Sequence, residues 1–357
     1  MATGGKDKVE QAGYRYAAPA HAEVTEILRT PKENRAALFA RADSLRREVM
    51  GDAVFLRGIV EFSNICANHC AYCGIRADNE KVCRYRMDDD EILAVAKKMP
   101  AWGQTTIVLQ SGEAPSITEN RRIGKLIERI KKETALAVTM SVGNRTRDVY
   151  AYWRNCGMDR YLLRFETSDP ELFARIHPDC SLEERLECLR ILKDLGVQTG
   201  GGFMIGVPGE TVDTLANNIL LCRELDLDMI GVGPFIPHPD TPLANAKNAY
   251  ADDPEMFFVA VAVLRLFNED AHIPATTAFD AIFPRGEGRD RVMQCGANVF
   301  MPNVTPQKYR ESYQLYPNKP NVDDDAEASI RRVVERLKAL GRPIGQGPGH
   351  SIKKRTY

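Results

Sequence analysis

Eight short apolar segments alternate with amphipathic segments along most of this 357-residue chain, and this repeat constrains the fold more than any other feature. The short segments have the side-chain alternation of β-strands, and a helical pattern follows each of them. Strands connected through helices run parallel, and eight such units close into a barrel. We therefore predict an α/β fold, a (β/α)8 TIM barrel. Its strands are predicted at residues 54–63, 105–110, 135–141, 160–165, 198–205, 229–234, 273–277 and 297–301.

The residues before the first predicted strand do not follow this repeat. Residues 1–22 are predicted to form a loose tail, whereas residues 23–47 are predicted to form one or two amphipathic helices broken near Pro31. No linker or low-complexity segment divides the remainder. We therefore expect residues 23–357 to form one domain, a barrel with an N-terminal helical extension.

Charge and composition argue against several classes of protein. The formal net charge is −1, which gives no reason to expect nucleic acid as a partner. No apolar run approaches the length of a membrane span, and the first residues lack the apolar core of a signal peptide. The nine cysteines are an odd number and three of them are clustered, so a disulfide framework is not expected. We expect a reducing cytoplasmic environment and no membrane contact.

The clustered cysteines Cys66, Cys70 and Cys73 have the spacing C-x3-C-x2-C and directly follow the first predicted strand. Three thiolates can hold three irons of a [4Fe-4S] cube and leave the fourth iron open for a substrate. Ferredoxin clusters and structural zinc sites use four protein ligands instead. One alternative stays open, because Cys83 or His69 could complete a four-ligand zinc or ferredoxin-like site.

Polar side chains share one face of several predicted strands near their C-terminal ends. Charges inside a barrel are costly unless they are paired or solvated, so a polar pocket is the simplest explanation. A buried network of structural ion pairs is the alternative. The residues concerned are Arg57, Glu61 and Ser63 in the first strand, Thr139 and Ser141 in the third, and Arg164 and Glu166 in the fourth.

The three-cysteine loop, with Tyr72 just before its last cysteine, resembles that of the radical S-adenosylmethionine (radical SAM) enzymes. In that superfamily the open iron chelates the amino and carboxylate groups of SAM. The segment Gln110-Ser111-Gly112-Glu113 ends the second predicted strand, and it is similar to the glycine-rich segment that contacts the amino group of SAM in those enzymes.

Longer strings resemble the HydE family, the radical SAM maturases of [FeFe]-hydrogenase. The resemblance runs from about residue 35 to the end of the chain, and biotin synthase and methylornithine synthase match these strings less well. The strings include Glu61-Phe62-Ser63-Asn64, Arg84-Tyr85-Arg86-Met87, Gly233-Pro234-Phe235-Ile236-Pro237-His238-Pro239-Asp240, Cys295-Gly296-Ala297-Asn298-Val299 and Tyr313-Gln314-Leu315-Tyr316-Pro317.

The resemblance implies roles for individual residues. It implies that Cys66, Cys70 and Cys73 hold one [4Fe-4S] cluster. It implies contacts to SAM from Tyr72, Gln110, Ser111, Gly112, Glu113, Thr139, Ser141, Glu166 and Arg185. It implies a substrate cavity lined by Arg57, Arg164, Thr276, Thr277 and Tyr316.

The resemblance also implies an activity, the reductive cleavage of SAM. The resulting 5'-deoxyadenosyl radical would act on an Fe(CO)2(CN) unit carried on cysteine and supplied by another maturase. Ferredoxin or flavodoxin would donate the electron. Two alternatives stay open: a radical SAM enzyme that acts on a small amino acid, as methylornithine synthase or biotin synthase-like relatives would, and a non-catalytic Fe-S or zinc protein.

The chain departs from the family pattern at two places. Phe165 stands where family members can carry histidine. Some members also have three further cysteines near the C-terminus for a second cluster, whereas no cysteine follows Cys295 here. We therefore predict one cluster per chain and expect Phe165 to be tolerated, since its strand parity points it away from Arg164.

Overall fold

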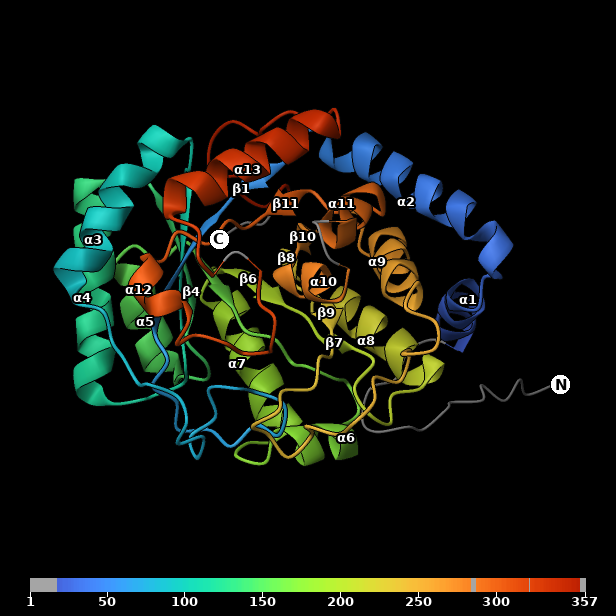
Figure 1. Cartoon of the computed structure of the whole chain (residues 1–357), viewed down its shortest axis with the longest axis horizontal. Coiled ribbons are helices and arrows are strands. Elements are labelled where there is room, and N and C mark those ends of the chain that lie inside the picture. Colours follow the sequence, from blue (N-terminus) through green and yellow to red (C-terminus); the bar gives the residue numbers. More distant parts are fainter. Residues whose placement is uncertain (1–17, 284–286, 321, 354–357) are drawn as a thin grey trace, which may run out of the picture.

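A parallel sheet of six strands, paired in chain order, forms most of a barrel in the computed structural model, which describes residues 18–283, 287–320 and 322–353. Figure 1 shows helices wrapped around these strands. The six strands are β2 (Gly58–Ser63), β3 (Thr106–Ser111), β4 (Ala137–Ser141), β5 (Arg160–Leu162), β6 (Gln198–Gly201) and β8 (Met229–Ile230).

Five further strands of two residues each complete the ring. They are β1 (Phe55–Leu56), β7 (Met204–Ile205), β9 (Gly233–Pro234), β10 (Pro274–Ala275) and β11 (Val299–Phe300). β1, β11 and β10 form a parallel sheet in that order, and β1 leads directly into β2. A parallel bridge between Met229 and His272 joins β8 to the chain that enters β10. Because β7 continues β6 and β9 continues β8, eight strand positions close into a ring, which confirms the predicted barrel.

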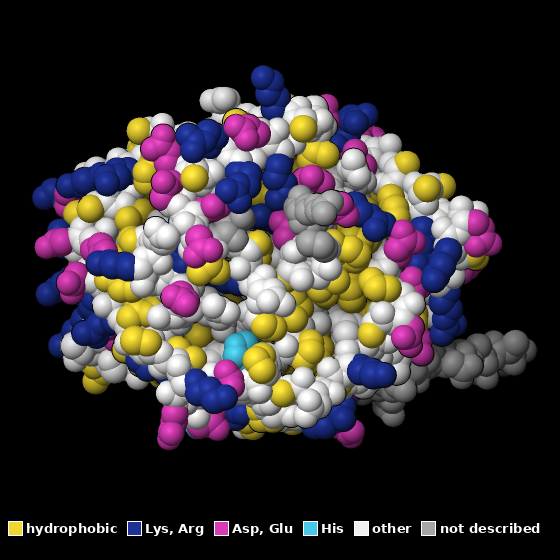
Figure 2. All heavy atoms as spheres, viewed as in Figure 1, with side chains coloured by type: hydrophobic (Ala, Val, Ile, Leu, Met, Phe, Trp, Pro, Cys, Tyr) yellow, Lys and Arg dark blue, Asp and Glu magenta, His cyan; other side chains and the backbone are white. Residues whose placement is uncertain are grey.

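Helices follow the strands as the sequence predicts, with two short additions. α10 and α12 were not expected, and α10 takes Thr277 out of the predicted seventh strand. In Figure 2 most charged side chains lie towards the edges of the view, over the outer helices. The helices are α3 (Asp89–Lys98), α4 (Ile117–Glu133), α5 (Arg147–Asn155), α6 (Pro170–Ile176), α7 (Leu182–Asp194), α8 (Val212–Glu224), α9 (Met256–Phe267), α10 (Thr277–Ile282), α11 (Glu287–Gln294), α12 (Gln307–Arg310) and α13 (Ala326–Ala339).

The N-terminal extension consists of α1 (Ala18–Leu28) and α2 (Arg35–Met50), which pack against α8 and α9 (Figure 1). An outer helix of a barrel usually keeps one polar face towards water. α9 is instead buried from Met256 to Arg265, because α2 covers it on the outside. α1 begins within the predicted tail, so residues 18–22 are helical, and residues 1–17 lie outside the described part. In that part, no helix combines the length and the apolar character needed to cross a membrane.

Residues 347–350 close the end of the barrel at which the strands begin. Side chains from the N-terminal ends of four strand positions donate hydrogen bonds to consecutive backbone carbonyls of this segment, so the segment acts as a floor. The bonds join Thr105 Oγ1 to Gly347 O at 2.7 Å, Arg160 Nη2 to Pro348 O at 2.8 Å, Arg57 Nη2 to Gly349 O at 2.9 Å and His272 Nε2 to His350 O at 3.1 Å.

Glu210, in the turn after β7, should make the stability of the fold depend on pH. Its buried carboxylate accepts a hydrogen bond from the Gly206 N–H at 3.0 Å, and burial raises its pKa to about 8 from an ordinary value of 4.5. Between these pH values the unfolded chain releases the proton while the folded chain keeps it. The stability that the protonated carboxyl contributes is therefore full below pH 4.5 and is lost as the pH rises towards about 8.

The variant Glu210→Gln cannot ionise and should avoid this loss. We expect its thermal midpoint to exceed that of the native chain by several degrees at about pH 9, and by much less at about pH 5. Thermal unfolding at both pH values measures the difference. An equal shift at the two pH values would show that Glu210 does not gain a raised pKa on folding.

Candidate active site

Side chains at the C-terminal ends of the strands enclose a cavity of about 320 Å³. Active sites of parallel barrels lie at this end, where the loops after several strands converge. The lining residues come from all around the ring. They include Glu61 from β2, Gln110 from β3, Ser141 from β4, Leu162 from β5, Met204 from β7, Pro234 from β9 and Ala275 from β10.

The cysteine loop follows β2 and borders this cavity. Cys66 and Cys73 line it, and Cys70 is buried next to them. Burial raises the pKa of the Cys66 and Cys70 thiols and raises the pKa of Cys73 to about 12. Backbone hydrogen bonds from Asn68 and Glu113 oppose this shift at Cys66 and favour its thiolate. Because burial favours the protonated thiols, a metal centre would have to displace their three protons when it binds.

Arg84 fixes the shape of the cysteine loop from inside. Its guanidinium donates hydrogen bonds only to backbone carbonyls there, between Asn64 and Asn79. A planar fork with five donors suits this role, because it ties several points of an irregular loop to one rigid group. The accepting carbonyls belong to Asn64, Ile75, Arg76, Ala77 and Asn79, at distances between 2.5 and 3.3 Å.

The four-ligand alternatives find no support in the loop. The Nδ1 atom of His69 lies 2.8 Å from Asp179 Oδ1, and its backbone N–H donates to the same carboxylate, so His69 has another partner. Cys83 is exposed. Across the described ranges, no three His, Cys, Asp or Glu side chains gather as they would around one metal ion.

The strand after the cysteine loop packs directly against it at Gly112. A Cβ atom there would lie 2.4 Å from the carbonyl oxygen of Ile65, so only glycine permits this approach. The neighbouring Glu113 extends towards Arg185, with 3.9 Å between Oε2 and Nη2. Gly143, at a φ of +83°, leaves room for the Glu113 carboxylate. The cavity wall next to the cysteine loop therefore carries an anion and a cation.

Arg185 is buried and is oriented by His177. Arg185 Nη2 donates to His177 Nε2 at 2.8 Å, which requires a neutral imidazole with its proton on Nδ1. Burial and the adjacent guanidinium lower the pKa of His177 to about 4, in agreement with a neutral ring. Arg185 Nε is buried without a hydrogen-bond partner. A ligand carboxylate would satisfy this donor.

Arg164 and Glu166 form an ion pair at the cavity, with 2.7 Å between Arg164 Nη2 and Glu166 Oε2. Glu166 has a φ of +63°, a left-handed conformation that non-glycine residues seldom adopt and that often marks functional sites. Phe165, between them, is fully buried and packs against Phe203 with 6.0 Å between ring centroids. The departure from the family pattern at Phe165 therefore lies in the core, outside the cavity lining.

We predict that Arg164→Ala and Glu166→Ala reduce turnover more than folding stability. Arg164 Nε is buried without a partner, so this arginine retains a donor for a ligand even when paired. Each variant should lose at least about tenfold in activity, the effect of one charge-assisted hydrogen bond. Turnover and thermal midpoint measure the two effects. If both variants lose several degrees of stability and keep their turnover, the pair is structural.

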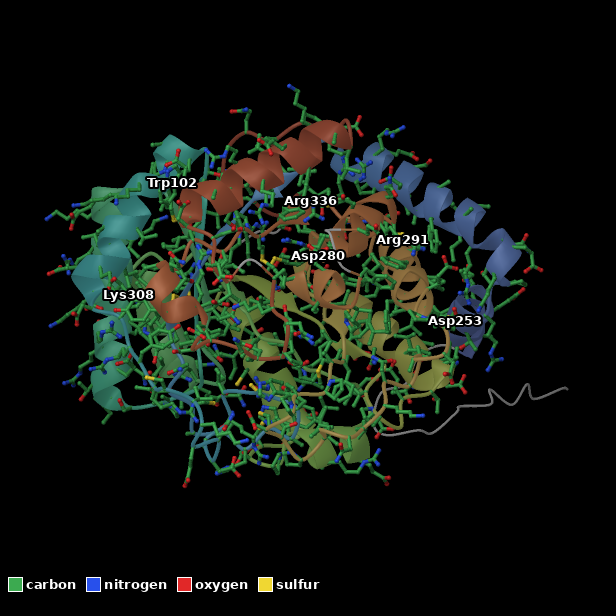
Figure 3. All side chains as sticks on the ribbon, viewed as in Figure 1. Trp102, Asp253, Asp280, Arg291, Lys308 and Arg336 are labelled. Carbon is green, nitrogen blue, oxygen red and sulfur yellow. The ribbon has the colours of Figure 1, made fainter. Side chains whose placement is uncertain are left out.

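The other polar wall of the cavity is built from hydroxyl groups. The hydroxyls of Thr277 and Tyr316 hydrogen-bond each other, and Thr276 Oγ1 donates to the Val232 carbonyl at 2.7 Å. Burial raises the pKa of Tyr316, which keeps its phenol neutral. Thr277 begins α10, and Asp280 anchors this helix to Arg336 of α13 at 3.1 Å (Figure 3).

The structure brings most of the predicted site residues to one cavity and leaves three outside its lining: Cys70, which is buried beside the other two cysteines, Arg57 and Thr139. Arg57 has the right strand face but lies before β2, at the barrel floor, where it bonds to Gly349. Thr139 precedes Ser141 by two residues on β4, so it is buried one layer below the cavity. The residues that line the cavity are Cys66, Tyr72, Cys73, Gln110, Ser111, Gly112, Glu113, Ser141, Arg164, Glu166, Arg185, Thr276, Thr277 and Tyr316.

Four polar residues of the lining had no role assigned to them from the sequence. Glu61, Tyr313, Lys319 and His177 all contribute polar groups to the cavity. Strand parity placed Glu61 among the polar residues that predicted a pocket, and the structure brings it to the cavity lining. Lys319 lies between α12 and α13 in a segment without regular structure, where no periodicity signals which side chains face inward.

Comparisons with known proteins agree with this geometry. The Radical SAM superfamily pattern matches residues 60–222. The [FeFe] hydrogenase maturase subunit HydE of Thermotoga maritima is 47% identical over 321 residues, which cover 90% of each chain. A 3-methylornithine synthase of Methanosarcina acetivorans is 28% identical over 309 residues, which cover 85% of this chain and 84% of that protein.

Two solved structures share the fold. Methylornithine synthase (PylB) superposes with a TM-score of 0.79 at 25% identity, over 91% of this chain and 94% of that one. The FeFe-hydrogenase maturase HydG of Carboxydothermus hydrogenoformans superposes with a TM-score of 0.77 at 22% identity, over 90% of this chain and 75% of that one.

Proposed function

Because the chain belongs to the HydE family of [FeFe]-hydrogenase maturases in the radical SAM superfamily, we propose that it acts on an Fe(CO)2(CN) unit carried on cysteine. It is a radical SAM enzyme and a hydrogenase maturase. In the proposal, another maturase supplies the substrate, and the product contributes to the diiron part of the hydrogenase H-cluster.

The observation that carries the proposal is the three-cysteine loop at the edge of a cavity that also holds a hydroxyl-rich wall. When bound, the [4Fe-4S] cluster supplies the electron that cleaves SAM into methionine and the 5'-deoxyadenosyl radical. A low-potential donor such as ferredoxin or flavodoxin would reduce it. Cys66, Cys70 and Cys73 would hold the cluster, and one open iron position suits the chelation of SAM.

Residues of this chain would bind and orient SAM. Glu113 can accept hydrogen bonds from the SAM amino group, and the unpartnered Nε of Arg185 can donate to its carboxylate. Gln110 and Glu166 would contact the remainder of SAM. Tyr72 packs against the apolar cluster of α6 and β7 and would help exclude water from the radical.

The substrate would occupy the part of the cavity next to Arg164, Thr276, Thr277 and Tyr316. A fixed position next to SAM would select which substrate atom the 5'-carbon reaches, by proximity alone. We propose that this atom is the cysteine sulfur. In the new bond from the 5'-carbon to the iron-bound thiolate sulfur, the radical and the sulfur each supply one electron, and the remaining sulfur electron passes to the substrate iron, which is reduced by one electron. SAM would be consumed in this step, and one methionine would be released for each adduct.

The test uses cluster-loaded protein, the iron-cysteine substrate and SAM labelled with 13C in its adenosyl carbons. The expected result is a labelled substrate adduct formed in step with methionine. Recovery of unchanged SAM after many turnovers, without adduct, would overturn the proposal. It would then favour the second candidate, rearrangement of a free amino acid, which the similarity to methylornithine synthase over most of the chain supports.

A further inference from the structure

Glu61 and Lys319 form a buried ion pair in the cavity lining, and none of the steps above uses it. Their side chains are 5% and 7% exposed. The second carboxylate oxygen of Glu61 accepts a hydrogen bond from Asn303 Nδ2 at 3.0 Å. The Lys319 ammonium also donates to the Tyr313 carbonyl at 3.1 Å and lies 5.1 Å from the centre of the Tyr313 ring. Two full charges therefore meet at the edge of a ligand cavity.

The pair joins two parts of the chain that are far apart in sequence. Glu61 lies on β2, within the barrel wall. Lys319 comes from residues 313–319, a segment that also contributes Tyr313, Leu315 and Tyr316 to the lining. The backbone N–H of Gly74 in the cysteine loop donates to the Leu315 carbonyl at 3.0 Å, which ties this segment to the loop. A ligand between these parts would meet both charges.

The pair belongs to the hydroxyl-rich part of the cavity. Lys319 and Thr277 also share a small crevice with Asn303 behind the cavity, and the charge of Glu61 acts on the phenol of Tyr316. The other lining cations are engaged elsewhere. Arg164 pairs with Glu166, and Arg185 is held by His177 close to Glu113. Glu61 and Lys319 therefore add a second ion pair to the substrate part, beside that of Arg164 and Glu166.

A buried ion pair is costly to break when only one partner is replaced, because the other charge is left uncompensated. A ligand that carries both charges avoids this cost, since its ammonium can pair with the carboxylate while its carboxylate pairs with the ammonium. The α-carbon of an amino acid presents these two groups side by side. Few other small ligands match an isolated Glu–Lys pair in this way.

We propose that the α-amino acid end of the substrate inserts between Glu61 and Lys319, with its carboxylate on Lys319 and its amino group on Glu61. This inference rests on the proposed function and deepens it, because it names the residues that select an amino-acid-borne substrate. Arg57, which the resemblance placed in the substrate cavity, lies at the barrel floor and is too deep for this contact. Lys319 takes its place.

The test compares three thioethers that cannot bind iron through a free thiol. S-methyl-L-cysteine carries both charged groups, 3-(methylthio)propionate lacks the amino group, and 2-(methylthio)ethylamine lacks the carboxylate. Their binding is measured by calorimetry on anaerobic, cluster-loaded protein saturated with SAM. The native chain should bind S-methyl-L-cysteine about tenfold or more tightly than either analogue, the effect of one charge-assisted hydrogen bond.

Two variants should change this order in opposite directions. Glu61→Gln should weaken the binding of S-methyl-L-cysteine and strengthen the binding of 3-(methylthio)propionate, because Lys319 is left without its carboxylate partner. Lys319→Met should weaken the binding of S-methyl-L-cysteine and strengthen the binding of 2-(methylthio)ethylamine, because Glu61 is left without its ammonium partner. Lys319→Arg keeps the charge and should retain the native order even if Lys319→Met folds poorly.

Lys308→Met is the matched control. Lys308 lies on the short helix α12 (Figure 3) and pairs with Glu91 at 2.8 Å, but it is 64% exposed and outside the cavity. This variant should bind the three probes as the native chain does. The inference would be overturned if both cavity variants lost affinity for all three probes to the same extent, or if neither variant changed the affinity for any probe. Either result leaves the proposed function intact, because the assay involves neither SAM turnover nor hydrogenase maturation.

Discussion

Simultaneous replacement of Cys66, Cys70 and Cys73 by alanine is expected to abolish both iron binding and SAM cleavage. No other group of thiols in the described part of the chain borders the cavity, so the cluster would lose all of its protein ligands. Iron and sulfide analysis after anaerobic reconstitution should give about four of each in the native chain and almost none in the variant.

Cys83→Ala is the control for this experiment. Cys83 is exposed and lies ten residues after Cys73, so its loss should leave the iron content unchanged. A native stoichiometry near eight irons would reveal a second cluster and contradict the prediction of one cluster per chain. Loss of iron in the Cys83 variant would instead restore the four-ligand alternative.

Arg84→Met should cause the second-largest effect, the loss of most of the reconstituted cluster. The guanidinium serves five loop carbonyls, and hydrogen bonds from a charged donor contribute about 1.5–3 kcal/mol each. Without them the loop keeps only its backbone hydrogen bonds, such as that from Ala77 N–H to the Asn68 carbonyl at 2.8 Å, and loses the one rigid group that ties its separate points together. The visible absorption of the cluster, and its decay under a mild iron chelator, measure the loss.

Two further variants separate the proposed role of Arg84 from a general loss of charge. Arg84→Lys keeps the charge but not the planar fork, so it should rescue the cluster only in part. Arg86→Met is the matched control, because Arg86 is 54% exposed and pairs with Glu119 at 3.1 Å outside the loop. If Arg84→Met retains a stable cluster, the loop is held by its own backbone instead.

Strand parity predicted which face a polar residue occupies, but not its height in the barrel. Arg164 and Glu166 share a face and both reach the cavity. Thr139 and Ser141 also share a face, yet only Ser141 reaches the cavity, because each step of two residues moves a side chain almost 7 Å along the strand. Arg57 is a second example. It lies on the predicted face of its strand, but at the floor of the barrel instead of at the cavity.

Irregular segments set the second limit. Lys319 and Tyr313 belong to a stretch without periodic pattern, and their inward orientation depends on contacts with β2 and the cysteine loop that appear only in three dimensions. The cysteine loop itself was predictable, because its function requires three thiols at short spacing. The barrel was predictable too, because eight repeats of one strand-helix pattern leave few other ways to bury their apolar faces.

The floor at residues 347–350 has a consequence for how this chain is made. Arg57 and its acceptor, the carbonyl of Gly349, are 292 residues apart, so the guanidinium enters the barrel long before its partner leaves the ribosome. Until then the open end of the growing barrel contains a charged guanidinium whose hydrogen-bond acceptor, the Gly349 carbonyl, has not yet been synthesised. Closure of this end of the barrel therefore waits for the translation of residues 347–350, and a growing chain that stops short of them exposes a charged, unsealed interior to chaperones and proteases.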